Sequence, residues 1–161
     1  MQQTIYIVRH AHASEAANDH DRPVSVKGER QLNRLCQGLA GKSLVNPSAV
    51  WHSDLRRAVE TARLLVAGFG VDAPLHTVNG LRPFDDPVPT AEIVDQSEEN
   101  LMIVGHEPNL SSLAAHLITE TQTLQCVVFP KSSMLCISRL RAGGQATPWQ
   151  IEWHVNHRIF K

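Results

Sequence analysis

The stretch Ile5-Tyr6-Ile7-Val8-Arg9-His10 begins the pattern that decides the fold. Its four β-branched or aromatic residues predict a short buried strand, and an arginine and a histidine close it. A later run, Leu101-Met102-Ile103-Val104-Gly105-His106, has the same form, and Val50-Trp51 repeats it more weakly. Two predicted strands therefore each present a histidine at the carboxyl end.

Helical periodicity separates these strands. Apolar residues recur at helical spacing over residues 32–39, 55–69 and 110–117. Ser53 is expected to cap the first turn of the second helix, which should end at Gly68 to Gly70. Strands that alternate with helices of this length predict an α/β fold with a largely parallel sheet and helices on both faces. Functional sites in such folds gather beyond the carboxyl ends of the strands.

The second half of the chain is less regular. Residues 81–90 are rich in proline and are predicted to form a loop, and residues 142–148 are predicted to form a turn. Further strands are expected at 127–129, 134–138 and 150–154. The sequence contains no internal repeat or interdomain linker, and one domain commonly takes roughly 100 to 200 residues. Residues 1–161 are therefore expected to form a single domain.

Composition narrows the possible functions. The 42% share of apolar residues and 19% share of charged residues are typical of a globular protein, and no apolar run reaches the roughly 20 residues of a membrane span. The first residues lack the features of a secretory signal, which favours a cytoplasmic location. A net charge of -1 without a Lys/Arg run disfavours nucleic-acid binding. The three widely spaced cysteines are expected to be buried thiols.

Four motifs together indicate phosphate chemistry. They are Val8-Arg9-His10, Arg22-Pro23, Ser53-x-x-x-Arg57-Ala58 and Gly105-His106. An Arg-His pair alone is commonplace at the end of a strand, but the ordered set is not a pattern that chance readily produces. A transferring phosphoryl group carries its charge on three equatorial oxygens, and planar guanidinium groups suit those oxygens. The predicted site is therefore a pocket for a phosphate or sulfate anion.

Each residue of this set has a predicted role. Arg9, Arg57 and Arg22 are expected to bind the phosphoryl oxygens without a metal ion or other cofactor. His10 is expected to attack as a neutral imidazole, because nearby arginines disfavour its protonation. His106 is expected to donate to the transferring oxygens, since one nucleophile suffices.

These motifs resemble those of the histidine phosphatase superfamily, which is phosphoglycerate mutase-like, and within it the small SixA-type phosphohistidine phosphatases. The similarity rests on Val8-Arg9-His10-Ala11, Asp19-x-x-Arg22-Pro23-Val24-Ser25 with Gly28, Ser53-x-x-x-Arg57-Ala58-x-x-Thr61, and Val104-Gly105-His106-x-Pro108. It implies a three-layer α/β/α sandwich with a mostly parallel central sheet, and a two-step reaction through phosphorylated His10. It also implies that Arg9, Arg57 and His106 form the phosphate pocket, with Arg22 and Asp19 as further substrate-binding residues.

The sequence departs from the family pattern at three places. Ala11 stands where glycine is frequent, Asp54 where proline is frequent, and Glu60 where glutamine is frequent. None of these changes removes a charge from the pocket. Asp54 adds an anion at the start of a helix, where it suits the helix dipole but is also in a position to face the phosphate.

The expected substrate is phosphohistidine on a signalling protein, such as a phosphorylated histidine-containing phosphotransfer domain. Residues 81–86 hold no clear equivalent of the glutamate acid that many ester-cleaving members of the family carry. An imidazole leaving group departs more readily than an alkoxide, so a weaker acid or none is tolerable. The short chain leaves no room for a large capping insertion, which favours a shallow site. If a proton donor is needed, the candidates are Asp19, Asp85, Asp86 and Glu107, each of which also fits a solvated loop carboxylate.

Three alternatives remain at this stage. His10-x-His12 also fits the start of a metal-dependent hydrolase, but such enzymes usually need a barrel of about 250 residues. His106-Glu107 does not begin an HExxH helix, because Leu110 occupies the place of the second histidine. A broad small-molecule phosphomonoesterase of the same superfamily is the second alternative. A non-catalytic module that binds phosphate or phosphohistidine is the third.

Overall fold

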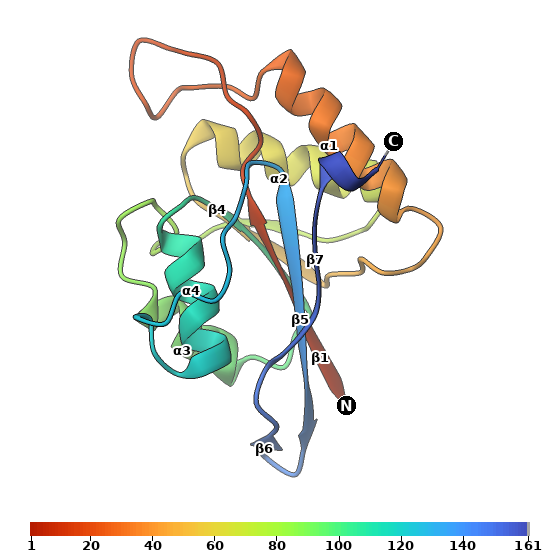
Figure 1. The fold of residues 1–161 in the computed structure, drawn as a ribbon, viewed down its shortest axis with the longest axis vertical. Helices are drawn as coiled ribbons and strands as arrows, with labels where there is room; N and C mark the ends of the chain where they lie inside the picture. Colours follow the sequence, from red (N-terminus) through yellow and green to blue (C-terminus); the bar gives the residue numbers. More distant parts are fainter. Residues whose placement is uncertain (161) are drawn as a thin grey trace.

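A single mixed sheet forms the centre of the molecule in a computed structural model that describes residues 1–160 (Figure 1). Its strands lie in the order β3-β2-β4-β1-β5-β6, and β7 pairs with the edge of β5 that faces away from β1. The strands are β1 (Gln2–Arg9), β2 (Ala49–His52), β3 (Leu75–Thr77), β4 (Leu101–Gly105), β5 (Ser133–Ala142), β6 (Gln145–Ala146) and β7 (Gln150–Asn156). The helices are α1 (Val26–Leu39), α2 (Arg56–Phe69), α3 (Val88–Gln96) and α4 (Asn109–Thr119), followed by a 3-10 turn, η1 (His157–Ile159).

The sheet has a parallel core and an antiparallel side. Strands β1, β4, β2 and β3 run parallel to one another. Strand β5 is antiparallel to β1, and both β6 and β7 are antiparallel to β5. The expected parallel α/β core is therefore confirmed, and β5 extends it as an antiparallel strand to which β6 and β7 both pair.

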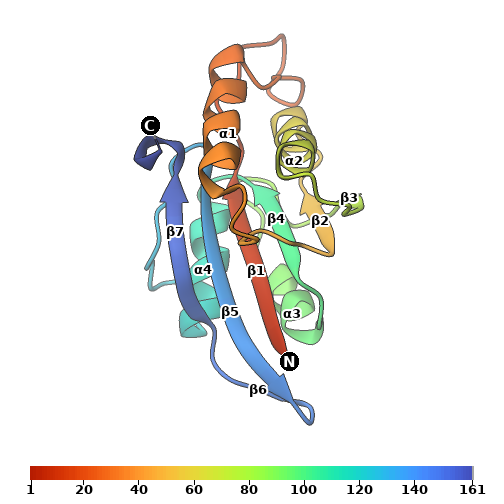
Figure 2. The same cartoon turned by 90° about the vertical axis from the view of Figure 1, so that its right-hand side faces the viewer.

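Helices cover both faces of the sheet, as the alternation of elements predicted (Figure 2). In β1, Tyr6 and Val8 point into a core with α1 and α2, whereas Ile5 and Ile7 point into a second core with α3 and α4. This division follows from the two-residue period of a strand. A strand with cores on both faces is apolar at every position, which explains the uninterrupted apolar run from Ile5 to Val8.

Several predicted elements differ from the structure. The loop predicted at 81–90 gives way to α3 at Val88, because prolines are tolerated in the first turn of a helix, where Pro89 lies. Residues 127–129 form no strand, although Val127 and Phe129 are buried. Strand β3 was not predicted, because it is short and lies at the edge of the sheet.

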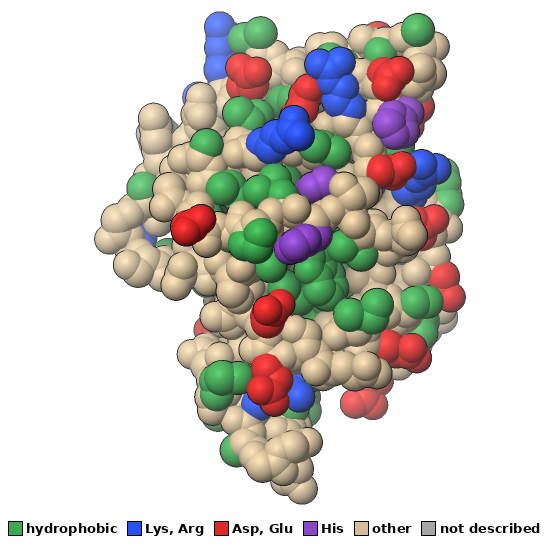
Figure 3. Space-filling view, turned by 180° about the vertical axis from the view of Figure 1, so that it is seen from behind, with side chains coloured by type: hydrophobic (Ala, Val, Ile, Leu, Met, Phe, Trp, Pro, Cys, Tyr) green, Lys and Arg blue, Asp and Glu red, His purple; other side chains and the backbone are tan. Residues whose placement is uncertain are grey.

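The surface carries both signs of charge. On the face opposite to that of Figure 1, basic and acidic side chains are intermixed toward the upper end (Figure 3). Over residues 1–160, no helix combines the length and the apolar character that crossing a bilayer would require.

Candidate active site

Strands β1 and β4 bring the two predicted histidines together. Arg9 and Gly105 are partners in the parallel register, and the His10 backbone N–H donates to the Gly105 carbonyl oxygen at 3.0 Å. The centroids of the His10 and His106 rings lie 4.9 Å apart. The two residues are only 7% and 2% exposed, so both rings lie at the floor of a site at the carboxyl end of the sheet.

The hydrogen bonds of His10 leave one ring nitrogen available. Nδ1 lies 2.7 Å from the Ala11 carbonyl oxygen, which can only accept, so Nδ1 carries the hydrogen and Nε2 holds the lone pair. Burial, with smaller contributions from the positive charges of Arg57 and Arg9, lowers the pKa of His10 to about 3 against the opposing effect of the Ala11 hydrogen bond. His10 is therefore neutral at pH 7, and its Nε2 lone pair is available, as the predicted nucleophilic role requires.

Ser53 orients the second histidine. Its hydroxyl oxygen lies 2.5 Å from His106 Nε2 and accepts from the Leu55 backbone N–H at 3.3 Å. In the tautomer that carries its hydrogen on Nδ1, His106 accepts from the Ser53 hydroxyl through Nε2 and keeps Nδ1 as a free donor. Burial lowers the pKa of His106 to about 3, with smaller contributions from His10 and Arg57. The predicted capping role of Ser53 is wrong: α2 begins after Leu55 without a side-chain cap.

Three buried side-chain nitrogens of the predicted site residues have no hydrogen-bond partner in the described chain. Arg9 Nη1 donates to the Phe129 carbonyl oxygen at 2.7 Å, and Arg57 Nη1 donates to the Asp19 carbonyl oxygen at 2.9 Å. Within residues 1–160, the Nε atoms of both arginines and His106 Nδ1 have no hydrogen-bond partner. They are half of the six buried side-chain polar atoms in that state. Because buried donors are nearly always satisfied, this concentration indicates an anion site.

Asp19 and Arg22 lie at the edge of this group. The Asp19 carboxylate contacts Arg22 Nη1 at 3.3 Å and Arg57 Nη2 at 3.2 Å, and its side chain is 63% exposed. Arg22 also donates through Nε to the Ser14 carbonyl oxygen at 3.2 Å. The structure therefore brings all six predicted site residues to one end of the sheet, with Arg22 and Asp19 toward solvent.

The sequence analysis missed Lys131. Burial and then the charges of Arg9, Arg22 and Arg57 lower the pKa of this lysine, which places it in the same positive field. Its loop contacts the site directly, because the Ser132 N–H donates to the His10 carbonyl oxygen at 3.3 Å. An isolated lysine in a loop without a motif gives no indication of this role in the sequence.

Thr61 connects the nucleophile strand to the arginine helix. Its hydroxyl accepts from the Ala11 N–H at 3.0 Å and donates to the Arg57 carbonyl oxygen at 2.6 Å. The threonine of the α2 motif therefore fixes the backbone that follows His10.

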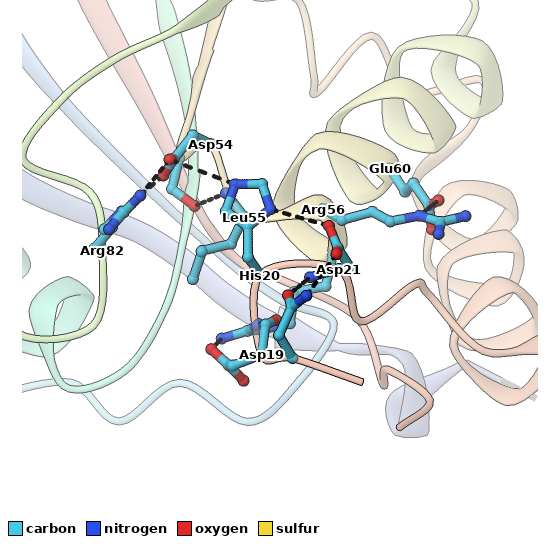
Figure 4. A network of polar contacts seen from close by, with 11 residues as sticks. Asp19, His20, Asp21, Asp54, Leu55, Arg56, Glu60 and Arg82 are labelled. Carbon is cyan, nitrogen blue, oxygen red and sulfur yellow. Dashed lines mark hydrogen bonds and ion pairs between the residues drawn. The ribbon is translucent and has the colours of Figure 1, made fainter. Parts of the chain in front are cut away.

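Asp54 and Glu60, the two acidic departures from the family pattern, both contact the segment between β1 and α1; the Asp54 contact is drawn in Figure 4. Asp54 pairs with Arg82 at 2.9 and 2.5 Å and lies 3.6 Å from His20 Nε2. Hydrogen bonds from Arg82 lower the pKa of Asp54 to about 2. Glu60 accepts from the Val24 backbone N–H at 2.7 Å. Asp54 thus faces Arg82, and its charge is compensated there.

Three of the four candidate proton donors are occupied by backbone contacts. Glu107 accepts from the backbone N–H and the hydroxyl of Ser111 and so caps the start of α4. Asp85 accepts from the Arg82 N–H at 2.9 Å, and Asp86 accepts from the Val88 N–H at 3.0 Å. Only Asp19 among the four contacts a predicted phosphate-binding side chain through its carboxylate.

The region has further features that bear on ligands. A cavity of about 630 Å³ lies beside the site, lined by Asp54 and Arg82 among others but by none of the predicted site residues.

Across the described residues 1–160, no three His, Cys, Asp or Glu side chains gather as a metal site requires. His12, part of the sequence pattern that suggested metal binding, contacts the Ser25 hydroxyl through Nδ1 at 2.7 Å.

Comparisons with known proteins agree with this geometry. The family model of the histidine phosphatase superfamily (branch 1) matches residues 5–85. An uncharacterized protein of Mycobacterium tuberculosis, Rv1276c, is 32% identical over 147 residues, which cover 85% of this chain and 88% of that protein.

Solved structures share the whole fold. The protein histidine phosphatase SixA complexed with tungstate has a TM-score of 0.80 at 20% identity and covers 98% of this chain and 99% of its own. A mycobacterial glucosyl-3-phosphoglycerate phosphatase has a TM-score of 0.68 at 15% identity, with 94% and 98% covered. The α-ribazole phosphatase from Shigella flexneri has a TM-score of 0.67 at 17% identity, with 91% and 94% covered.

Proposed function

The chain belongs to the histidine phosphatase superfamily and is a phosphatase, and we propose that it removes phosphate from phosphohistidine on a signalling phosphotransfer protein. The observation that carries the proposal is that the described residues around a neutral histidine with one free ring nitrogen leave three buried nitrogens without a partner. Arg9 Nε, Arg57 Nε and His106 Nδ1 lack partners within the described chain, and His10 is held with Nε2 deprotonated. A tetrahedral anion satisfies all of these groups at once.

The reaction proceeds in two steps. His10 Nε2 attacks the phosphorus, the bond from phosphorus to the substrate nitrogen breaks, and its electron pair leaves with the substrate imidazole. The arginines and His106 stabilise the charge on the equatorial oxygens during transfer. Water then attacks the phosphorus of phosphorylated His10, the new P–N bond breaks, and phosphate is released with neutral His10. The low pKa of His10 keeps its lone pair available for the first step of each turnover.

Two features support phosphohistidine over an alkyl phosphate ester. Glu107, Asp85 and Asp86 accept hydrogen bonds in caps and turns, and none of them contacts a predicted phosphate-binding side chain as a proton donor to an alkoxide would be expected to. The groups at the edge of the site, Asp19 and Arg22, lie on a loop that is open to solvent, which suits a histidine presented by another protein. Small-molecule phosphatases of the same fold make a sugar or nucleotide phosphate the second candidate.

The experiment compares wild type, His10→Ala and the matched control His76→Ala. His76 is an exposed histidine on β3, outside the proposed site. Each protein is incubated with a phosphotransfer domain labelled on histidine, in EDTA, and with sugar and nucleotide phosphates. Wild type and His76→Ala are expected to release the label and to form an acid-labile phosphoenzyme, whereas His10→Ala does neither.

The outcomes separate the candidates. Faster turnover of small esters than of phosphohistidine would favour the second candidate. Label release that survives His10→Ala, or that requires an added metal ion, would overturn the mechanism. Binding of phosphate with no turnover of any substrate would indicate a recognition module.

A further inference from the structure

Among the acidic groups of the described chain, only Asp19 contacts Arg57 of the proposed phosphate pocket through its carboxylate, whereas the exposed Glu15 contacts Arg22 at 3.5 Å. The two carboxylate oxygens of Asp19 contact Arg22 Nη1 and Arg57 Nη2 at 3.3 and 3.2 Å. Arg57 is also held by a bond from Nη1 to the Asp19 carbonyl oxygen, which belongs to the backbone. The side-chain charge is therefore not needed to place Arg57, and the carboxylate is available for another purpose.

The loop that carries Asp19 is fixed on both sides. His20 Nδ1 lies 3.2 Å from the Asp21 carboxylate, and the His20 carbonyl oxygen accepts from the Arg56 N–H at 3.0 Å (Figure 4). The Asn18 side chain bonds both the backbone and the carboxylate of Asp21. A carboxylate on so tightly bonded a turn occupies a defined position, as a group that recognises substrate must.

In-line transfer places the leaving group on the Asp19 side of the pocket. His10 is 7% exposed and His106 is 2% exposed, so the nucleophile attacks from the buried floor. The leaving atom must lie opposite the attacking atom, which is toward solvent. Asp19, with 63% of its side chain exposed, lies on that solvent side of Arg57.

The charge state of Asp19 decides what it can do there. Desolvation raises its pKa, but hydrogen bonds from Arg22 and Arg57 and the charges of both lower it more, so the net shift is downward. Its charged and titratable neighbours are Arg22 on its own loop, Arg57 on α2 and His106 after β4. A carboxylate that is ionised at pH 7 cannot protonate a departing alkoxide, but it accepts hydrogen bonds strongly.

On the basis of the proposed function, we infer that Asp19 selects phosphohistidine by accepting a hydrogen bond from the distal ring N–H of the leaving imidazole. When the P–N bond breaks, its electron pair goes to the nitrogen that carried phosphorus. The proton on the other ring nitrogen stays in place, so a neutral imidazole departs and no proton transfer to the leaving atom is needed. An ester leaves an anionic oxygen instead, which the Asp19 charge repels.

The test measures kcat/KM of wild type and Asp19→Asn on a phosphohistidine protein and on p-nitrophenyl phosphate. Asparagine keeps the shape and one acceptor oxygen but removes the charge. We expect kcat/KM to fall about 10- to 100-fold on phosphohistidine, the value of a hydrogen bond to a charged group, and to rise on the ester. The basic limb of the kcat profile on phosphohistidine should also move to lower pH, because the distal nitrogen loses its counter-charge.

The matched control is Asp21→Asn, which removes a carboxylate from the same loop that contacts His20 rather than Arg57. It is expected to leave the ratio of the two activities unchanged. Equal losses on both substrates in Asp19→Asn, or no change in either, would overturn the inference and leave the proposed function standing. Absence of phosphohistidine turnover in wild type would instead remove the proposed function itself.

Discussion

Two buried arginines at opposite ends of the sheet differ in how completely they are satisfied. Arg139 and Arg57 are 7% and 5% exposed. Arg139 donates through Nε to Gln3 at 2.8 Å and through Nη1 and Nη2 to Asp95 at 2.7 and 2.9 Å, and its guanidinium lies 4.2 Å from the ring of Trp149. In the described residues, Arg57 leaves Nε without a partner.

The contrast separates a structural charge from a functional one. Each of the three guanidinium nitrogens of Arg139 donates a hydrogen bond, so this residue ties β1, β5 and α3 together. The carboxyl end of the sheet instead leaves donors of Arg9, Arg57 and His106 unpaired, at a cost to stability that a bound anion would offset. Burial and charge alone would not distinguish the two arginines, whereas the number of guanidinium nitrogens that form hydrogen bonds does.

The strongest test of this contrast is Arg57→Met. Removing a guanidinium that stabilises the transferring phosphoryl group should lower kcat by about 10³-fold or more. The free energy of unfolding should change by less than about 1 kcal/mol, because the lost bonds are to the exposed Asp19. Urea denaturation and phosphate release on one preparation measure both quantities. Loss of stability comparable to that of a core substitution would show that Arg57 is structural.

The reverse pattern is expected for Arg139→Met. This change removes three hydrogen bonds to Asp95 and Gln3, and the oxygens that lose them still accept from Trp149 and Arg141. It should lower the free energy of unfolding by about 2 to 3 kcal/mol, less than for a fully buried pair because Asp95 is 45% exposed. The value of kcat/KM per folded molecule should stay at the wild-type level, because the cluster lies at the far end of β1 from His10. A fall in activity beyond the unfolded fraction would contradict the separation of the two ends.

The sequence predicted the catalytic end of the molecule better than the rest. Continuous apolar runs before His10 and His106 predicted two central strands, and parallel strands in register necessarily bring their ends together. The motif spacing also predicted Arg57, because a helix following a strand returns its first turn to the same edge. The three-layer arrangement followed from the alternation of strands and helices.

What escaped prediction depends on long-range contacts. Lys131 joins the site through a loop that Arg9 holds by the Phe129 carbonyl oxygen, a bond spanning 120 residues. The Arg139 cluster pairs residues of β1, α3 and β5 that share no local pattern. The bonding of Asp54 to Arg82 was likewise invisible, because the partner lies 28 residues away in a loop.

The last expected effect concerns the pH dependence of stability, and it belongs only to the end of the sheet that carries the unpartnered nitrogens. The native pKa values of His10 and His106 are about 3, whereas an unfolded histidine titrates near 6.5. Between these values the unfolded chain binds a proton that the native site excludes. Stability is therefore fully present above about pH 6.5 and falls as the pH drops, by about 1.4 kcal/mol per pH unit for each histidine.

His106→Gln should make this slope shallower by the share of one histidine, whatever it does to stability at pH 7. Urea denaturation between pH 4.5 and 6.5 measures the slope for wild type, His106→Gln and Arg139→Met. Arg139→Met should lower the whole curve and keep the wild-type slope, because an arginine does not titrate in this range. If wild type and His106→Gln instead show the same slope of the free energy of unfolding against pH, then His106 takes up its proton in the native state. The site would then not exclude protons, and this difference from the Arg139 cluster would be lost.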